Sequence, residues 1–303
     1  MDKPSFAIQL NELRPPAELD LLLRTIEEIG YRKVTLPDHM DRQAAPQAGV
    51  GYIAARTAKT IAGTLVLNNE LRHPGLVARE FATLAGLFPD RIDLGVGAGW
   101  KSSDLAAAGI SFLPARERID RLAEALEIFS ATAAGKHLDF DGRFYQIADL
   151  PLPAISAPFA ITVGGGGERM LRLAAVYGDT VGINPRLTTG DFTEETIAEL
   201  TLAAHIAKIE VVRKTAAEHG RSPLLQVRTV LARVGDDARG WLSETAAAFG
   251  VDLADALMMP PVLVGSVEEL VDKVGRLNAE YGIGEWVLHE DQIESFAPVV
   301  AAF

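Results

Sequence analysis

The feature that most constrains the fold is a repeated unit, one apolar strand followed by one amphipathic helix, which recurs roughly every 30 residues along the chain. Eight strands of this kind are predicted, over residues 5–10, 33–37, 63–67, 91–96, 159–163, 179–184, 225–234 and 285–289. Helices separate these strands, so the sheet is predicted to be parallel. The number of units favours closure into a (β/α)8 TIM barrel, and an open doubly wound sheet is the alternative.

The repeat is interrupted once. Residues 136–158 begin with alternating apolar and polar positions around Asp141 and Gly142, which predicts a β-hairpin, and prolines at 151, 153 and 158 indicate an irregular link back to the barrel. One barrel accommodates all 303 residues as a single domain. We therefore expect one domain over 1–303, with 136–158 as a hairpin-containing insertion over one rim.

Composition narrows the class of protein. Lys and Arg number 29 against 41 Asp and Glu, and the resulting net charge of −12 disfavours binding to the phosphate backbone of nucleic acids. The absence of cysteine excludes disulfides, thiolate-zinc sites and a cysteine nucleophile. No apolar run approaches the roughly 18 residues of a membrane helix, and the start does not resemble a signal peptide. We expect a soluble, cytoplasmic protein with neither nucleic-acid nor membrane partners.

Four consecutive glycines, 164–167, follow the apolar run 159–163 and precede an amphipathic helix. Glycines allow the backbone to approach a bulky anion and to adopt positive φ, and the first N–H groups of the helix then point at that anion. The stretch therefore predicts a phosphate-binding turn, and a tight turn without a ligand is the alternative. It is not a Walker loop, because no Gly-Lys-Ser/Thr follows.

Polar residues and glycines stand at the predicted carboxyl ends of several strands, where a barrel places its chemistry. They are Asp38, His39, Asn68, Asn69, Asn184 and the stretches 97–100 and 164–167. All of them are expected to face one mouth of the barrel.

Five motifs, in order, resemble the bacterial luciferase-like monooxygenase superfamily. They are LPDH (36–39), GTLVLNN followed by RHP (63–69 and 72–74), RIDLGVGAGW (91–100), VGGGGERMLRLAA (163–175) and LVGSVEEL (263–270). The resemblance runs from about Phe6 to His289 and is closer to the deazaflavin-dependent oxidoreductases that use coenzyme F420. It implies the same barrel, a homodimer and F420 as cofactor, with FMN as the alternative because both present a tricyclic ring and a phosphate.

The resemblance also implies roles for individual residues. His39 is expected to be the acid or base of the reaction, a role that suits a group whose ordinary pKa lies near neutrality, and its alternative role is to order a loop. A non-prolyl cis peptide is expected between Leu65 and Leu67, behind the cofactor ring. The implied cofactor-binding residues are Asp38, Val66, Leu67, Asn68, Gly97, Ala98, Gly99, Val163, Gly164, Gly165, Gly166 and Gly167.

One position departs from the pattern of the sugar-phosphate dehydrogenases of this family, which carry an acidic residue where this chain has Trp100. An apolar ring excludes an acid at that point and implies a more apolar substrate pocket, with Trp100 either contacting substrate or packing at the rim. Arg169 and Arg172 are expected to meet the acidic tail of F420 or to form surface salt bridges. The remaining histidines have no partner at ligand spacing, and no metal is assigned.

The expected activity is hydride transfer between the C5 of F420 and a small, apolar organic substrate. An FMN-dependent monooxygenase and a non-catalytic barrel that binds a flavin-like molecule are the alternatives. The insertion 136–158 and the loop 185–193 are expected to be walls or lids of the site, or dimer contacts.

Overall fold

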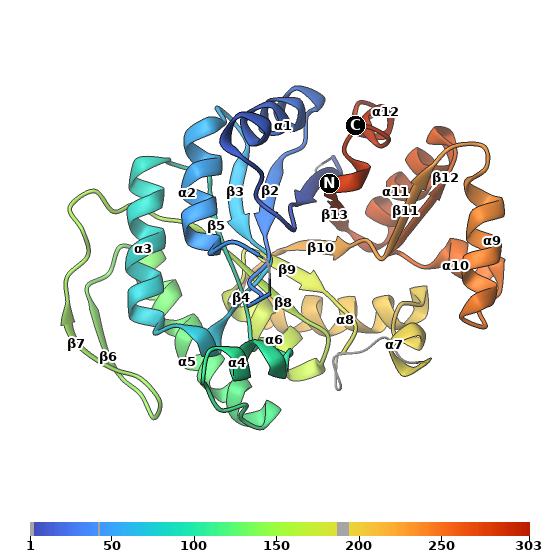
Figure 1. The fold of residues 1–303 in the computed structure, drawn as a ribbon. Helices are drawn as coiled ribbons and strands as arrows, with labels where there is room; N and C mark the ends of the chain where they lie inside the picture. Colours follow the sequence, from blue (N-terminus) through green and yellow to red (C-terminus); the bar gives the residue numbers. More distant parts are fainter. Residues whose placement is uncertain (1–2, 42, 187–193) are drawn as a thin grey trace.

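A computed structural model describes residues 3–41, 43–186 and 194–303. Eight parallel strands close into a barrel, and the third is split in two, as β3 and β4 (Figure 1). The prediction of a (β/α)8 TIM barrel is confirmed, because β3 pairs with both β2 and β5 and closes the ring. The strands are β1 (Ser5–Gln9), β2 (Lys33–Leu36), β3 (Ile61–Thr64) with β4 (Leu67–Asn68), β5 (Ile92–Gly97), β8 (Ala160–Gly165), β9 (Thr180–Ile183), β10 (Leu224–Arg228) and β13 (Ile283–His289).

Helices cover the outside of the barrel, as Figure 1 shows. The longer ones are α1 (Pro16–Ile29), α2 (Pro46–Arg56), α3 (Pro74–Leu87), α5 (Ala115–Ala133), α6 (Glu168–Tyr177), α8 (Leu202–Glu218) and α11 (Val267–Tyr281). Proline at the first turn favours the start of α1, α2 and α3, and Ser266 with Glu269 forms the predicted capping box of α11. Another helix of comparable length is α9 (Ala238–Ala248). Shorter helical segments are η1 (Asn69–Leu71), α4 (Ser102–Ala107), α7 (Glu194–Ala198), α10 (Leu253–Met258), η2 (Glu290–Gln292) and α12 (Ala297–Val300).

The interior of the barrel is polar, while the apolar core lies between strands and helices. Lys33 Nζ lies 2.6 Å from Asp93 Oδ2 and 3.0 Å from Glu285 Oε1, and all three side chains are buried. These residues come from β2, β5 and β13, none of which is adjacent to another, so the contacts must cross the inside of the ring. Side chains alternate between the two faces of a strand. The residue two positions after each of these three therefore also faces the interior of the barrel, nearer the carboxyl end of its strand.

Three predicted elements differ from the structure. The polar run 41–51, rich in Gln, Ala and Gly, predicts a loop, but α2 begins within it at Pro46. The stretch 194–219 predicts one long helix, but it forms two helices, and Thr201 caps the second. The strand predicted over 225–234 is also two strands. Its second half, β11 (Leu231–Val234), leaves the barrel and pairs with β12 (Val262–Gly265).

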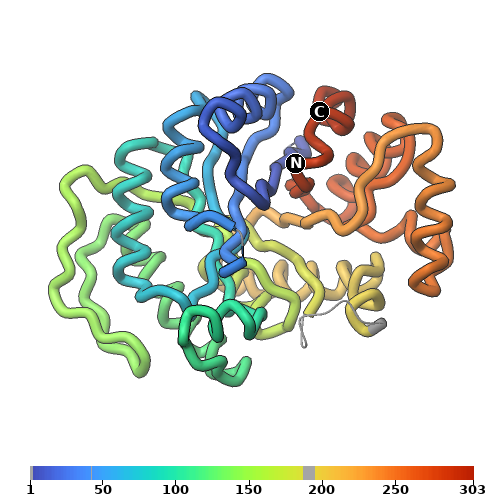
Figure 2. Tube along the Cα trace, in the orientation of Figure 1, coloured from blue at the N-terminus to red at the C-terminus, as the bar shows by residue number. Residues whose placement is uncertain are grey.

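The β11–β12 pair and α9 and α10 form a lobe at the side of the barrel, which Figure 2 follows in orange between β10 and α11. The lobe has its own apolar cluster, which includes Leu242, Met259 and Val262. The strand prediction failed here because the apolar run continues across Thr229, where the backbone turns out of the barrel.

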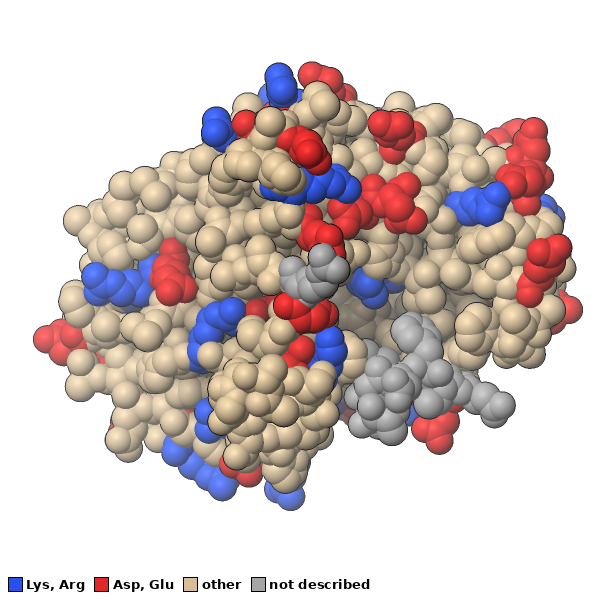
Figure 3. Space-filling model, viewed as in Figure 1, with Lys and Arg blue, Asp and Glu red and all other residues tan. Residues whose placement is uncertain are grey.

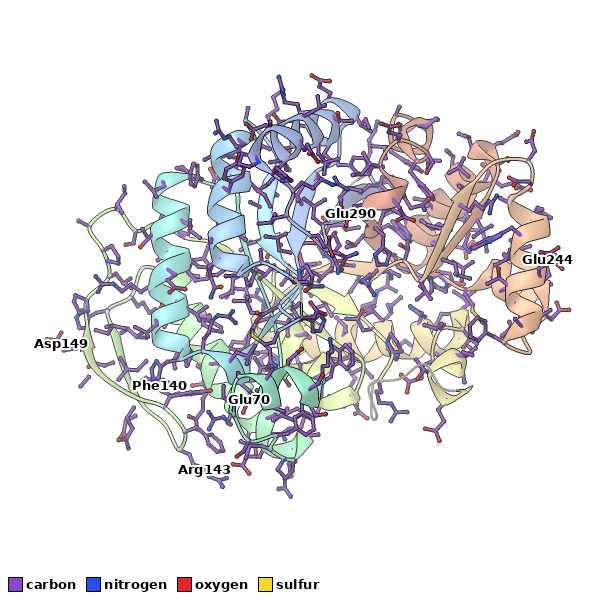
Figure 4. The ribbon with its side chains drawn as sticks, viewed as in Figure 1. Glu70, Phe140, Arg143, Asp149, Glu244 and Glu290 are labelled. Carbon is purple, nitrogen blue, oxygen red and sulfur yellow. The ribbon has the colours of Figure 1, made fainter. Side chains whose placement is uncertain are left out.

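The predicted insertion is a hairpin of β6 (Leu138–Asp141) and β7 (Gln146–Leu150), paired antiparallel. It stands beside α3 and α5, where Figure 4 labels Phe140, Arg143 and Asp149. The carboxylate of Glu124 accepts the backbone N–H groups of Arg143, Phe144 and Tyr145, and so fixes the turn to α5. Among the described residues, no helix combines the length and the apolar composition needed to cross a bilayer.

Candidate functional site

His39 follows the carboxyl end of β2 and forms a close pair with Asp104 on α4. Its Nδ1 lies 2.6 Å from Asp104 Oδ2, and the other carboxylate oxygen accepts the N–H of Met40 at 3.1 Å. Asp104 is 3% exposed, whereas the His39 side chain is 24% exposed. A buried carboxylate at Nδ1 orients the ring and favours the tautomer in which Nδ1 carries the proton, which leaves Nε2 to act on a bound molecule.

Trp100 stands at the rim of the mouth next to this pair. Its ring meets the His39 ring edge to face, with 5.6 Å between the centroids, and the residue is 38% exposed. Trp100 therefore packs on His39 and keeps an accessible apolar surface, and contact with substrate stays a prediction. Lys101 lies 3.3 Å from Asp41 and 3.6 Å from Asp104, which fixes the start of α4.

Asp38 is buried and its carboxylate is occupied by the protein. Arg72 donates to both of its oxygens, at 2.5 and 2.9 Å, and the N–H of Asn68 donates to Oδ2 at 2.9 Å. The residue therefore joins the ends of β2 and β4 to the RHP motif. Its expected contact with the cofactor stays a prediction, and Arg72 is a partner that sequence reasoning did not assign to the site.

The expected non-prolyl cis peptide is present, between Leu65 and Val66. Val66 packs into a bay of glycines: a methyl group at Gly97 would lie 2.9 Å from Val66 Cγ2, and one at Gly164 would lie 3.4 Å from Cγ1. These glycines therefore make room for Val66, a requirement the sequence did not reveal. Leu67 and Val163 belong to the hydrophobic core, so they can offer a ligand only backbone atoms.

Asn68 and Gly99 determine each other's position. Gly99 has φ +73°, and a methyl group there would lie 2.2 Å from Asn68 Oδ1. The same oxygen accepts the N–H of Glu70 at 3.0 Å. The carbonyl of the neighbouring Ala98 accepts from Arg118 Nη1 at 3.3 Å. This corner of the mouth is therefore rigid before any ligand binds.

The glycine turn is shorter than predicted, because β8 continues through Gly165 and α6 begins at Glu168. A methyl group at Gly166 would lie 2.4 Å from the carbonyl oxygen of Asn184, whereas one at Gly167 would meet only Arg186 Cδ, at 3.6 Å. None of the four glycines has positive φ. Close packing, rather than unusual dihedral angles, thus requires glycine at 166.

The amides of this turn remain available to an anion. Within the described part of the chain, no acceptor is bonded to the N–H of Gly166 or Gly167, and the first amides of α6 have no partner inside the helix. All four glycines are partly exposed. The turn therefore fits the phosphate of a nucleotide-like cofactor.

Polar side chains also gather where β1, β10 and β13 end. Arg228 donates through Nε to Gln9 Oε1 at 2.9 Å and through Nη2 to His289 Nε2 at 3.1 Å. Sequence reasoning did not single out Gln9 or Arg228, although each is a polar residue at the end of an apolar strand. Asn184 ends β9 at the mouth, as expected. The face in Figure 3 is hollowed near its centre, and a basic side chain is visible in the hollow.

Other candidates have structural roles. Arg169 forms a salt bridge with Asp120, and Arg172 forms one with Glu168 at 2.7 Å. Both arginines thus form surface salt bridges, which was one of the two roles expected for them. His73 caps α3, and His205 is buried, which lowers its pKa to about 4. Among residues 3–41, 43–186 and 194–303 no three potential ligands gather as a metal site. Residues 187–193 of the expected lid lie outside the described residues.

Comparison with solved structures identifies the same fold in redox enzymes. An F420-dependent secondary alcohol dehydrogenase superposes with a TM-score of 0.76 at 18% identity, covering 99% of both chains. Long-chain alkane monooxygenase superposes with a TM-score of 0.72 at 16% identity, covering 100% of this chain and 91% of the other. At these identities the superpositions establish the fold alone.

Curated relatives are nearer in sequence. The F420-dependent glucose-6-phosphate dehydrogenase of Microbacterium testaceum is 36% identical over 176 residues, which cover 54% of this chain and 52% of the relative. The F420-dependent hydroxymycolic acid dehydrogenase of Mycobacterium tuberculosis is 33% identical over 164 residues, 50% of this chain and 45% of the relative. The match thus spans about half the length of these relatives.

A profile described as luciferase-like monooxygenase matches residues 5–249, and this match takes in β1 through β10 with the His39–Asp104 pair, the cis peptide and the glycine turn. The chain therefore belongs to the luciferase-like monooxygenase family.

Proposed function

We propose that the protein is an F420-dependent oxidoreductase that transfers hydride between the cofactor and a small organic substrate. The observation that carries this proposal is the placement of free amides at Gly166 and Gly167 and of the His39–Asp104 pair at one mouth. The F420-dependent dehydrogenases among the curated relatives support the same cofactor. We further propose that residues 1–303 act as one functional domain.

When bound, the deazaflavin supplies a carbon that gives or accepts hydride. The amides of the glycine turn would hold its phosphate, and the segment around Val66 would support the ring. His39 Nε2 would take the hydroxyl proton when an alcohol is oxidised and return it when a carbonyl is reduced. Asp104 keeps Nε2 directed at the substrate, because it binds the opposite nitrogen. Trp100 beside His39 gives the acceptor an apolar wall and excludes water.

The phosphate site is tested by placing a fixed negative charge at Gly167. Gly167 is the N-cap of α6, its φ of −84° suits any residue, and there is room for a side chain. In Gly167→Asp the carboxylate would accept the free amides of α6 and repel a phosphate. We expect unchanged or slightly raised thermal stability, and an affinity for F420 that falls by about tenfold or more.

Two matched variants separate charge from bulk. Gly167→Asn occupies the same amides without charge, and Gly167→Ala adds only a methyl group. We expect the wild type to bind F420 most tightly, followed by Gly167→Ala, Gly167→Asn and Gly167→Asp in that order. Affinity is measured by equilibrium fluorescence titration, with FMN titrated in parallel. Equal F420 affinity in all four proteins would remove the phosphate site. Binding of FMN but not F420 by the wild type would replace the proposed cofactor.

A further inference from the structure

Arg228 carries a positive charge that no carboxylate of the described residues neutralises. Its hydrogen bonds within the described residues go to two neutral side chains, Gln9 and His289, and no carboxylate of these residues forms an ion pair with it. His289 accepts at Nε2, so its proton is on Nδ1 and the ring is neutral. Burial and the charge of Arg228 both lower the pKa of His289, and the lower pKa keeps the His289 ring neutral.

Two of the neighbouring acidic residues, Glu290 and Glu285, are already paired, and a third, Asp291, acts on His289 but forms no ion pair with Arg228 among the described residues. Glu290, labelled in Figure 4, binds Arg14 at 3.0 Å and accepts the N–H of Asn11. Glu285 lies deeper in the barrel and binds Lys33 and Gln226. Burial lowers the pKa of Arg228, and no carboxylate acts against this effect. A half-buried guanidinium with only neutral partners costs stability, because it has lost water without gaining a counter-charge.

One nitrogen of the guanidinium is left without a partner in the described chain. Nη1 makes no hydrogen bond in the described chain, yet it is not among the enclosed polar atoms that lack a partner. Arg228 points into the barrel because Gln226, two residues earlier, does so to reach Glu285. It therefore presents unused N–H groups to the mouth.

The position of Arg228 in the ring is also informative. Around the barrel β10 is the seventh strand and β3–β4 is the third, so Arg228 lies diametrically opposite the cis peptide at Leu65–Val66. The glycine turn that fits a phosphate belongs to β8, two strands away from β10. A planar ring supported at Val66 would therefore turn its other face toward Arg228.

We propose that Arg228, held by Gln9 and His289, binds an anionic group of the substrate, so that the substrates of this enzyme are organic acids with a carboxylate or similar oxyanion. A guanidinium matches a carboxylate through two parallel N–H groups, and the fixed partners at Nε and Nη2 orient the remaining donors. Naming the ligand as substrate rests on the proposed function, whereas the anion site itself does not.

A groove beside this cluster accommodates the rest of such a molecule. It has a volume of about 770 Å³ and runs from His289 and Asn11 along β11 to Trp241 in the lobe. Val230, Leu231 and Val234 give it an apolar wall, and the carboxylates of Glu290 and Asp291 also line it, so an anionic head group fits only at the Arg228 end. This volume lies within the range of small-molecule sites, roughly 300–1,000 Å³. The groove therefore fits an apolar chain attached to the anionic group.

The experiment compares hexanoate with hexanamide, which differ only in charge and hydrogen bonding at the head group. Isothermal titration of the full chain, with and without F420, measures both affinities. For the wild type we expect hexanoate to bind about tenfold more tightly than hexanamide. Arg228→Gln removes this preference. Arg233→Gln is the matched control, since Arg233 lines the same groove but already pairs with Asp237, and it keeps the preference.

A second variant tests the site even if Arg228→Gln does not fold. Gln9→Glu places a carboxylate beside Nε of Arg228 in a side chain of the same shape, so it supplies the missing counter-charge. We expect it to raise the thermal midpoint and to abolish the preference for hexanoate. Retention of the preference in Gln9→Glu would overturn the proposal.

F420 titrations of the same variants separate substrate from cofactor. We expect Arg228→Gln to bind F420 as tightly as the wild type. A tenfold loss of F420 affinity in Arg228→Gln, or no difference between hexanoate and hexanamide in the wild type, would overturn the proposal. A wild type that prefers hexanoate but binds no F420 would refute the proposed function and leave the anion site established.

Discussion

Glu27 on α1 is predicted to hold the start of β3 in place through its ionised carboxylate. Its oxygens accept the backbone N–H groups of Ala58, Lys59 and Thr60, at 2.7 to 3.0 Å, and the hydroxyl of Thr60. Partial burial alone would raise the pKa of Glu27, but these hydrogen bonds outweigh it and lower the pKa from 4.5 to about 2. Because β3 leads directly to the cis peptide, this anchor also supports the mouth.

A carboxyl group with a lower pKa in the folded than in the unfolded state stabilises the fold above its unfolded pKa. The contribution of Glu27 should be complete above about pH 4.5 and disappear as the pH falls toward 2. The difference between the two pKa values corresponds to roughly 3 kcal/mol at neutral pH. Solvent screening of this partly exposed side chain reduces the expected contribution to about 1 to 2 kcal/mol.

The assay is urea unfolding of wild type and Glu27→Gln at pH 7 and at pH 3. We expect the variant to be less stable by about 1 to 2 kcal/mol at pH 7, with the difference shrinking toward zero at low pH. Glu28→Gln is the control, since the neighbouring Glu28 is exposed and should change stability little at either pH. A deficit of equal size at both pH values, or none at pH 7, would refute the role of the ionised carboxylate.

Two further predictions concern the site and the barrel interior. In Asp104→Ala, we expect ¹⁵N NMR to show that His39 loses its preference for the Nδ1–H form, and we expect kcat to fall about 100-fold while F420 affinity is kept. Asp41→Ala, at an exposed residue, is the control and should leave the His39 spectrum and kcat unchanged. An unaltered His39 spectrum in Asp104→Ala would contradict the pairing. In Lys33→Met, Asp93 and Glu285 lose their shared cation, and the free energy of unfolding should fall by about 3 to 5 kcal/mol in urea denaturation. Wild-type stability in Lys33→Met would show that the buried triad is not charged.

The fold was predictable because the strand-and-helix period is continuous in sequence and eight units close naturally. Failures arose where one apolar run serves two elements. Residues 225–234 form a barrel strand and then β11, because Thr229 donates its N–H and hydroxyl to Val287 and the next residues leave for the lobe. Likewise Thr201 caps a second helix inside a stretch with uniform helical character.

The positions of residues at strand ends were predictable, whereas the partners of their side chains were not; the roles of these residues stay predictions. His39, Asn184 and the glycine turn are found at the mouth, as expected. Asp104 lies 65 residues from His39 in sequence, and Arg228 lies 219 from Gln9, so no local pattern connects them. The role of Gly97 was also hidden, since it depends on where the bulge directs Val66.

The two halves of the barrel mouth have different inward surfaces, and we expect one half to bind the cofactor and the other to bind the substrate. On β5, β8 and β9 the inward positions nearest the mouth include Gly95, Gly97, Gly164 and Gly182, and Val66 packs against the first three. A large planar ring has room only where such side chains are missing. On β10, β13 and β1 the inward positions end in a charge and two polar groups, Arg228, His289 and Gln9, which can discriminate among substrates by hydrogen bonding. Substitutions on the second half should therefore change substrate preference without weakening the cofactor, whereas any side chain larger than hydrogen at Gly97 should displace Val66 and act on the cofactor first.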